Sequence, residues 1–281
     1  MKSVAEARES GKIKNRLYGA HLEGPYFSLS QCGGQPAGHI SVPKKEEYRA
    51  IVDEWGTYIA RWSYAPEKDK DGSFCKFITE HGIIASAGHT DAKYEDMQIA
   101  IQNGCNLVTH LYSYTSTITR DHGFRSLGVI ETAYLRNELY VEIIADGKHL
   151  PPDLIKMIIQ IKGVDKVALV SDSLHVAGVY PIDAKIECED MIIEDGVCKL
   201  KDRSAFKGSI ATANVLLKTL VKDCGIAIPD AVKMLTEVPA KILKANDLGR
   251  LAEGCLGDVV AFDENFNVTD VFVGEKKYEV L

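Results

Sequence analysis

Several features that would direct a protein to a membrane or out of the cell are missing from this 281-residue sequence. No apolar stretch approaches the roughly 18 residues of a membrane span, and the first 16 residues contain no apolar run typical of a signal peptide. The seven cysteines include no Cys-x-x-Cys pair, so they are expected to be reduced thiols rather than a disulfide framework. These absences predict a cytoplasmic protein with no membrane partner.

An excess of positive charge is also missing. The chain has 33 Lys and Arg against 40 Asp and Glu, a formal net charge of −7, which argues against nucleic acid as a partner. No Gly-x-Gly-x-x-Gly motif follows an early strand, so nothing supports a dinucleotide site. An anionic small molecule is still compatible with this charge, because a few local cations and helix N-termini can bind a phosphate.

What the sequence does contain is an alternation of strand-like and helix-like segments. The helical patterns cover residues 44–55, 91–104 and 151–163, where Pro151 and Pro152 suit a first turn and Gly104 and Gly163 suit C-caps. The short apolar runs typical of strands lie at 17–24, 57–67, 82–90, 105–111, 139–147 and 166–173. This alternation predicts an α/β fold with a parallel sheet covered by helices. A TIM-type barrel is favoured, because polar residues of ligand type stand at the strand ends.

After about residue 178 the pattern changes. Residues 181–200 predict a hairpin that turns at Asp195-Gly196, and helical stretches follow over 211–225 and 229–243. The tail, 257–281, alternates like antiparallel strands. We therefore expect a barrel domain over 1–235 and a small β-rich C-terminal segment over 236–281, part of a β-sandwich.

The polar strand ends are candidates for a hydrolytic metal site. Glu23, His89 and His110 would supply three ligands, and Asp172 or His149 would transfer protons. Structural roles compete with these assignments: a buried ion pair for the carboxylate, core packing for the histidines and a helix N-cap for Asp172. Glu67 could contact the substrate, but an ion pair in the core is the favoured interpretation, and His21 is either a support for the site or a core histidine.

The literal motifs at these positions carry a family resemblance. They are HLEGPY (21–26), AGHTDA (87–92), VTHLY (108–112), ADGKHL (145–150) and VSDS (170–173), with SYAPE (63–67) and the segment 235–263 as further matches. In order and spacing the chain resembles the N-acetylglucosamine-6-phosphate deacetylases, which are metal-dependent amidohydrolases, over roughly residues 11–281.

The resemblance implies a role for each matching residue. Glu23, His89 and His110 correspond to the ligands of a divalent ion, usually zinc or iron. Asp172 corresponds to the catalytic aspartate that takes a proton from water and returns it to the sugar amine, and His149 to a histidine that contacts the sugar. The implied substrate is N-acetylglucosamine 6-phosphate, the products are glucosamine 6-phosphate and acetate, and the implied assembly is a homodimer.

The chain departs from the family pattern in three places. Gln35 stands where the family usually has a substrate-binding histidine. After Leu111 the chain reads Tyr-Ser-Tyr-Thr, so Ser113 and either Arg120 or Arg125 are expected to contribute to binding of the sugar phosphate. Sequences of the family also start about a hundred residues before the point that matches the start of this chain. In this chain we count six barrel-type strands, whereas a closed barrel has eight.

These departures motivate two alternatives to the main hypothesis. One is a truncated or degenerate paralogue that binds metal or sugar without turnover. The other is a deacetylase for a different N-acetylhexosamine, with or without a phosphate.

Overall fold

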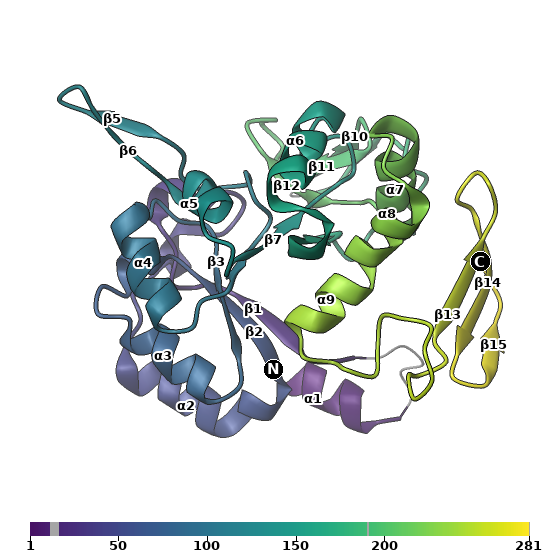
Figure 1. The fold of residues 1–281 in the computed structure, drawn as a ribbon, viewed down its shortest axis with the longest axis horizontal. Helices are drawn as coiled ribbons and strands as arrows, with labels where there is room; N and C mark the ends of the chain where they lie inside the picture. Colours follow the sequence, from purple (N-terminus) through teal and green to yellow (C-terminus); the bar gives the residue numbers. More distant parts are fainter. Residues whose placement is uncertain (12–16, 190, 281) are drawn as a thin grey trace. The chain divides into compact units, whose positions relative to one another are not determined.

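The computed structural model describes residues 1–11, 17–189 and 191–280, and its central feature is a six-stranded sheet in the order β1-β2-β3-β4-β7-β8 (Figure 1). The pairs from β1 through β7 are parallel. The strands are β1 Ala20–Glu23, β2 Ile59–Tyr64, β3 Ile84–Ala87, β4 Leu107–Val108, β7 Tyr140–Ile143 and β8 Val167–Leu169. The predicted α/β class is confirmed, and six strands of this kind correspond to a partial barrel.

The chain divides into two compact units, Met1–Val141 and Glu142–Leu281, and the boundary lies inside β7. This division does not test the domain boundary predicted at residue 235, which stays a prediction. Among the described residues, no helix is long and apolar enough to cross a membrane.

The first unit covers its strands with helices. Its helices are α1 Lys2–Glu9, α2 Lys45–Trp55, α3 Ser73–Glu80, α4 Tyr94–Gln102 and α5 Val129–Leu135, with 3-10 turns η1 Leu29–Gln31, η2 Ala37–His39, η3 Gly56–Tyr58 and η4 Pro66–Lys68. A two-stranded hairpin, β5 Thr119–Asp121 and β6 Phe124–Ser126, projects from the unit (Figure 1). The helices predicted over 44–55 and 91–104 are confirmed as α2 and α4.

The second unit combines helices with two antiparallel sheets. Its helices are α6 Pro152–Lys162, η5 Val164–Lys166, α7 Ala213–Lys218, the π-helical turn η6 Thr219–Asp223, α8 Ile228–Leu235 and α9 Glu237–Ile242. One sheet holds β9 Ile186–Glu187, β10 Ile192–Glu194, β11 Val197–Lys199 and β12 Phe206–Ser209, and the other holds β13 Val259–Phe262, β14 Val268–Val273 and β15 Lys276–Tyr278. The predicted β-rich C-terminal part is therefore confirmed.

Local sequence signals account for several of these boundaries. Helix α6 starts after Pro151 and ends at Gly163, whose φ of 76° favours glycine. The hairpin β10–β11 turns at Asp195 and Gly196, which have φ of 55° and 79°. The single helical stretch predicted over 229–243 is wrong in one respect, because it breaks into α8 and α9. Pro239 has no N–H to donate inside a continuous helix, and the structure places it in the first turn of α9 instead.

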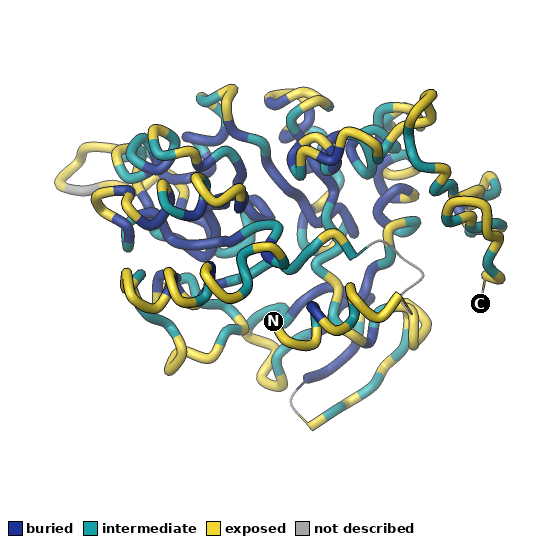
Figure 2. Tube along the Cα trace, turned by 90° about the horizontal axis from the view of Figure 1, so that it is seen from below, coloured by how far each residue is buried: buried dark blue, intermediate teal, exposed yellow. Residues whose placement is uncertain are grey.

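The core of the first unit is organised around Phe74, a fully buried residue of α3. Figure 2 shows buried residues along the strands and exposed residues on the loops. The Phe74 ring lies 5.1–5.2 Å, centroid to centroid, from the rings of Tyr26, Tyr48, Trp62 and Tyr64. All four contacts have edge-type geometry, which aromatic rings prefer to a face-to-face sandwich.

We expect Phe74→Ala to lower the free energy of unfolding by about 3–5 kcal/mol, because a buried aromatic ring leaves a cavity when it is removed. Phe124→Ala is the matched control, since Phe124 is 80% exposed and should cost less than about 0.5 kcal/mol. Urea unfolding of both variants measures the difference. Equal losses would contradict this description of the core.

Candidate metal centre

Three side chains converge at the carboxyl ends of three parallel strands of one sheet, β1, β3 and β4. Glu23 is the last residue of β1, while His89 and His110 each stand two residues beyond the ends of β3 and β4. Carboxyl ends of parallel strands meet at one edge of a sheet, which is where barrel enzymes carry their ligands. Residues 87 positions apart in the chain are brought into contact in this way.

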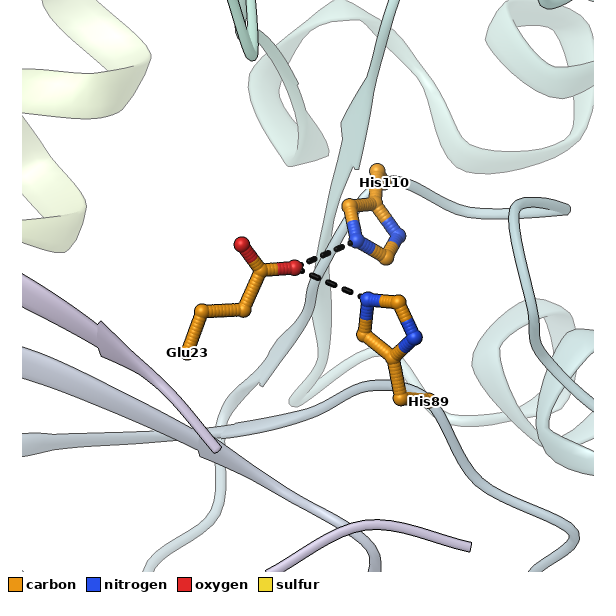
Figure 3. Close-up of side chains that lie close together, drawn as sticks. All are labelled: Glu23, His89 and His110. Atoms are coloured by element: carbon orange, nitrogen blue, oxygen red, sulfur yellow. Dashed lines mark hydrogen bonds and ion pairs between the residues drawn. The ribbon is translucent and has the colours of Figure 1, made fainter. Parts of the chain in front are cut away.

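The geometry of the cluster is compact. The Nε2 atoms of His89 and His110 both lie 2.9 Å from the same atom, Glu23 Oε1 (Figure 3). The ligand atoms of the three residues all lie within 4.8 Å of one another. The histidine side chains are 6% and 5% exposed, against 22% for Glu23, so the carboxylate is the accessible member.

The backbone at these histidines has an uncommon conformation. His89 has a φ of 49° and His110 a φ of 29°, in the left-handed region that few residues other than glycine adopt. Asp172, in the second unit, has a φ of 46°. Such backbone tends to occur at functional sites, where the surrounding structure imposes it. His89, His110 and Asp172, which were predicted from separate motifs, therefore all have a left-handed backbone.

Hydrogen-bond roles around His89 require a proton or a metal ion between this residue and Glu23. The backbone carbonyl of Gln31 lies 2.8 Å from His89 Nδ1 and can only accept, so Nδ1 carries a proton. In the neutral ring, Nε2 then presents a lone pair to the Glu23 carboxylate, which also offers only lone pairs when ionised. A proton or a metal ion must lie between them. Two imidazole nitrogens and one carboxylate oxygen fit a divalent ion such as zinc or iron.

The ionisation of Glu23 agrees with this donor set. Burial raises the pKa of Glu23, but His110 and His89 in their protonated forms lower it by more, through hydrogen bonds and charge, so its pKa lies well below the usual range. The residue is therefore an anion, the form that binds a metal.

The imidazole of His89 stacks against two aromatic rings. It stacks on Phe27 at 4.4 Å and on Tyr114 at 5.4 Å, with interplanar angles of 30° and 12°. Gly33 makes room for Tyr114, since a Cβ at that position would lie 2.5 Å from the tyrosine ring. Tyr114 belongs to the segment in which the sequence departs from the family pattern.

A directed chain of hydrogen bonds runs along the strands below the cluster. Arg61 donates to His21 Nδ1 at 2.8 Å, so His21 must donate from Nε2 to Ser63 Oγ at 2.7 Å. The Ser63 hydroxyl lies 2.6 Å from that of Thr109, the residue before His110. Burial, and next the charge of Arg61, lower the pKa of His21 to about 3, so its ring is neutral. His21 is thus a half-buried, hydrogen-bonded histidine in a network that passes Thr109, beside the predicted ligand His110, and continues to Ser86.

The second unit holds the remaining predicted catalytic groups. His149 Nδ1 lies 2.7 Å from Asp146 Oδ2, and Asp146 Oδ1 accepts the backbone N–H groups of Lys148 and His149. This pairing fixes the ring so that Nε2 is the nitrogen that could contact a substrate. Asp172 follows β8, and its carbonyl accepts the backbone N–H of Ser209 at 3.2 Å.

The predicted substrate-binding residues of the first unit are not all brought to the cluster. Gln35 lines a pocket of about 300 Å³ together with Glu23 and His39, and the Ser113 N–H donates to the carbonyl of His110 at 2.9 Å. Arg120 and Arg125 instead face each other across the projecting hairpin β5–β6. Both arginines are exposed, and their substrate role stays a prediction.

The residues that surround His89 are not predicted from the sequence, and the contacts of Glu67 differ from the expected ion pair. Nothing in the local sequence marks Gln31, Phe27 or Tyr114 as neighbours of the candidate metal-binding cluster. A fourth residue, Asp91, does lie inside the AGHTDA motif, but the motif alone gave it no role. Glu67 was expected to form an ion pair, and the structure instead shows it accepting hydrogen bonds from the Thr90 hydroxyl at 2.5 Å and the Asp91 N–H at 3.0 Å.

Comparison with known proteins identifies the class. The model of the amidohydrolase family matches residues 42–278, which is most of the chain. The chain therefore belongs to the amidohydrolase family. Members of this superfamily depend on metal, and the Glu23, His89 and His110 cluster is a possible site for one.

Within this family, the predicted resemblance to the N-acetylglucosamine-6-phosphate deacetylases is confirmed. The chain is 29% identical over 253 residues to the enzyme of that name from Lysinibacillus sphaericus, covering 89% of this chain and 63% of the relative. It is similar in structure to the Pasteurella multocida deacetylase, with a TM-score of 0.87 and 28% identity over 98% of this chain and 71% of that one.

A second solved structure adds a ligand to the comparison. A variant of the Mycobacterium smegmatis deacetylase, in complex with N-acetyl-D-glucosamine-6-phosphate, matches with a TM-score of 0.86 and 26% identity over 98% of this chain and 71% of that one. The chain thus spans a little under two thirds of the length of the L. sphaericus relative and somewhat more of the two solved chains.

We expect the unmutated protein to retain about one divalent ion per chain after dialysis, the number that a single three-ligand set holds. Glu23→Gln should lose most of it, because an amide is a much weaker ligand than a carboxylate. Metal analysis by atomic emission measures the stoichiometry. Glu54→Gln, at an exposed position of α2, is the control, and full retention by Glu23→Gln would rule out its ligand role.

Proposed function

We propose that the chain hydrolyses the N-acetyl group of N-acetylglucosamine 6-phosphate and releases glucosamine 6-phosphate and acetate. The observation that carries this proposal is the Glu23, His89 and His110 cluster at the strand ends, in a chain whose relatives bear the name of that activity. Zinc or iron is the proposed metal, since two imidazoles and one carboxylate suit either ion.

The residues of the chain would divide the chemistry among them. A divalent ion held by the cluster would supply a polarised water and draw charge from the amide carbonyl. Asp172 would accept the proton that this water loses on attacking the carbonyl carbon and return it to the sugar nitrogen as the carbon–nitrogen bond breaks. Its left-handed backbone, with a φ of 46°, supports a functional role.

Binding of the sugar would use the polar groups around the site. His149, held by Asp146, would contact the sugar, and Gln35 and Ser113 would donate hydrogen bonds to it. Arg120 and Arg125 stand directly opposite each other, an arrangement that is unfavourable for like charges unless an anion lies nearby. We propose that they bind the substrate phosphate in the partner subunit of a homodimer, and that the enzyme acts in the cytoplasm.

The direct test incubates metal-loaded protein with N-acetylglucosamine 6-phosphate and assays for acetate. Activity should fall strongly when the 6-phosphate is omitted, because the phosphate contacts would be lost. Absence of acetate, with the metal verified in place, would overturn the proposed activity for this chain. Equal turnover of sugars with and without phosphate would overturn only the phosphate specificity.

We expect Asp172→Asn to reduce kcat by about 10²–10⁴-fold, the usual contribution of a general acid–base group, while metal remains bound. Asp223→Asn, an exposed carboxylate of the same unit, should leave turnover unchanged. Steady-state kinetics with metal analysis of each variant separates the two. Near-normal activity of Asp172→Asn would mean that another group transfers the proton.

A further inference from the structure

Two hydrogen bonds, one in each direction, join His89 to the segment Ser28–Gln31, which contains η1. The Ser28 N–H donates to the carbonyl of His89 at 2.9 Å, and His89 Nδ1–H donates to the carbonyl of Gln31 at 2.8 Å. The position of the Gln31 carbonyl therefore decides which tautomer His89 adopts.

One carboxylate, that of Asp91, holds this turn in place. Its Oδ2 accepts the Ser28 hydroxyl at 2.8 Å and also the Ser30 hydroxyl, and its Oδ1 accepts Gln31 Nε2 at 2.6 Å. The three donors span η1 and the residue before it. Asp91 thus fixes the turn on which the Gln31 carbonyl stands.

Asp91 is itself fixed by Glu67 of the 3-10 turn η4, which follows β2. Its backbone N–H donates to Glu67 at 3.0 Å, and Glu67 also accepts the Thr90 hydroxyl at 2.5 Å. The carboxylate of Asp91 is not used to cap the following helix, because the cap of α4 is formed by Lys93 and Asp96. The side-chain hydrogen bonds described for Asp91 therefore all lead to the turn, and the charge of Lys68 acts on the same carboxylate.

We propose that Asp91 is a positioning residue of the metal centre: it holds the Ser28–Gln31 turn so that the Gln31 carbonyl keeps a proton on His89 Nδ1 and leaves the Nε2 lone pair for the metal. This role rests on the metal binding proposed above. Partners of this kind orient a ligating imidazole, and their loss typically weakens metal binding by about 10–100-fold.

The test compares three variants by zinc titration against a competing chelator. Asp91→Ala removes all three acceptors and should weaken zinc binding about 10–100-fold. Asp91→Asn should bind within a few-fold of the unmutated protein, since its oxygen can accept both serine hydroxyls while its amide donates to a flipped Gln31 side chain. Asp53→Ala, at an exposed position of α2, should have no effect.

A second measurement reports on the histidine itself. In the zinc-loaded protein, the Nδ1–H proton of His89 should exchange slowly and be visible by proton NMR, and in Asp91→Ala it should exchange faster. Melting temperatures of the metal-free variants show whether each one folds. Should Asp91→Ala fail to fold, the double variant Ser28→Ala with Ser30→Ala removes two of the three donors and should weaken zinc binding in the same direction.

The outcomes are distinct. Equal zinc affinity of Asp91→Ala, or of the double serine variant, and the unmutated protein would overturn the positioning role. An equal loss in Asp91→Ala and Asp91→Asn would overturn it too, because it would mean that the charge matters and not the hydrogen bonds. An unmutated protein that binds no zinc or iron would overturn the proposed function first, and this role with it.

Discussion

The arrangement of the first unit depends on one carboxylate oxygen that faces two imidazole nitrogens. Glu23 Oε1 lies 2.9 Å from Nε2 of both His89 and His110, and at His89 two lone pairs would meet at this distance unless a proton or a metal ion lies between them. Strand order places the three residues at one edge of the sheet, the left-handed backbone aims the imidazoles, and burial makes the ionised carboxylate costly unless cations compensate it. The same constraint explains why so many contacts converge on His89.

Much of the fold could be predicted from the sequence because its signals are local. The run of apolar residues in each strand, the prolines before α6 and the Asp195-Gly196 turn all act over a few residues. The break between α8 and α9 was missed because the apolar periodicity continues through it, while Pro239 requires a new helix start. The three members of the cluster were predicted from their motifs.

The surroundings of the cluster could not be predicted in the same way. Gln31 and His89 are 58 residues apart, and the contact uses a backbone carbonyl, which any residue type would supply. The stacking of Tyr114 depends on the absence of a side chain at Gly33, and neither position shows this in its own sequence context. The sequence thus predicts the three residues of the cluster itself. The residues that orient them can be identified only from the folded structure.

The positive φ of His89 and His110 limits which residues could replace them. β-Branched residues strain such backbone, whereas aspartate and asparagine adopt it more readily than most. An exchange of either histidine for aspartate would therefore keep the chain path and replace a nitrogen ligand with an oxygen. Oxygen-rich ligand sets favour magnesium and manganese over zinc, so the backbone of this centre leaves its metal preference open to change by single substitutions.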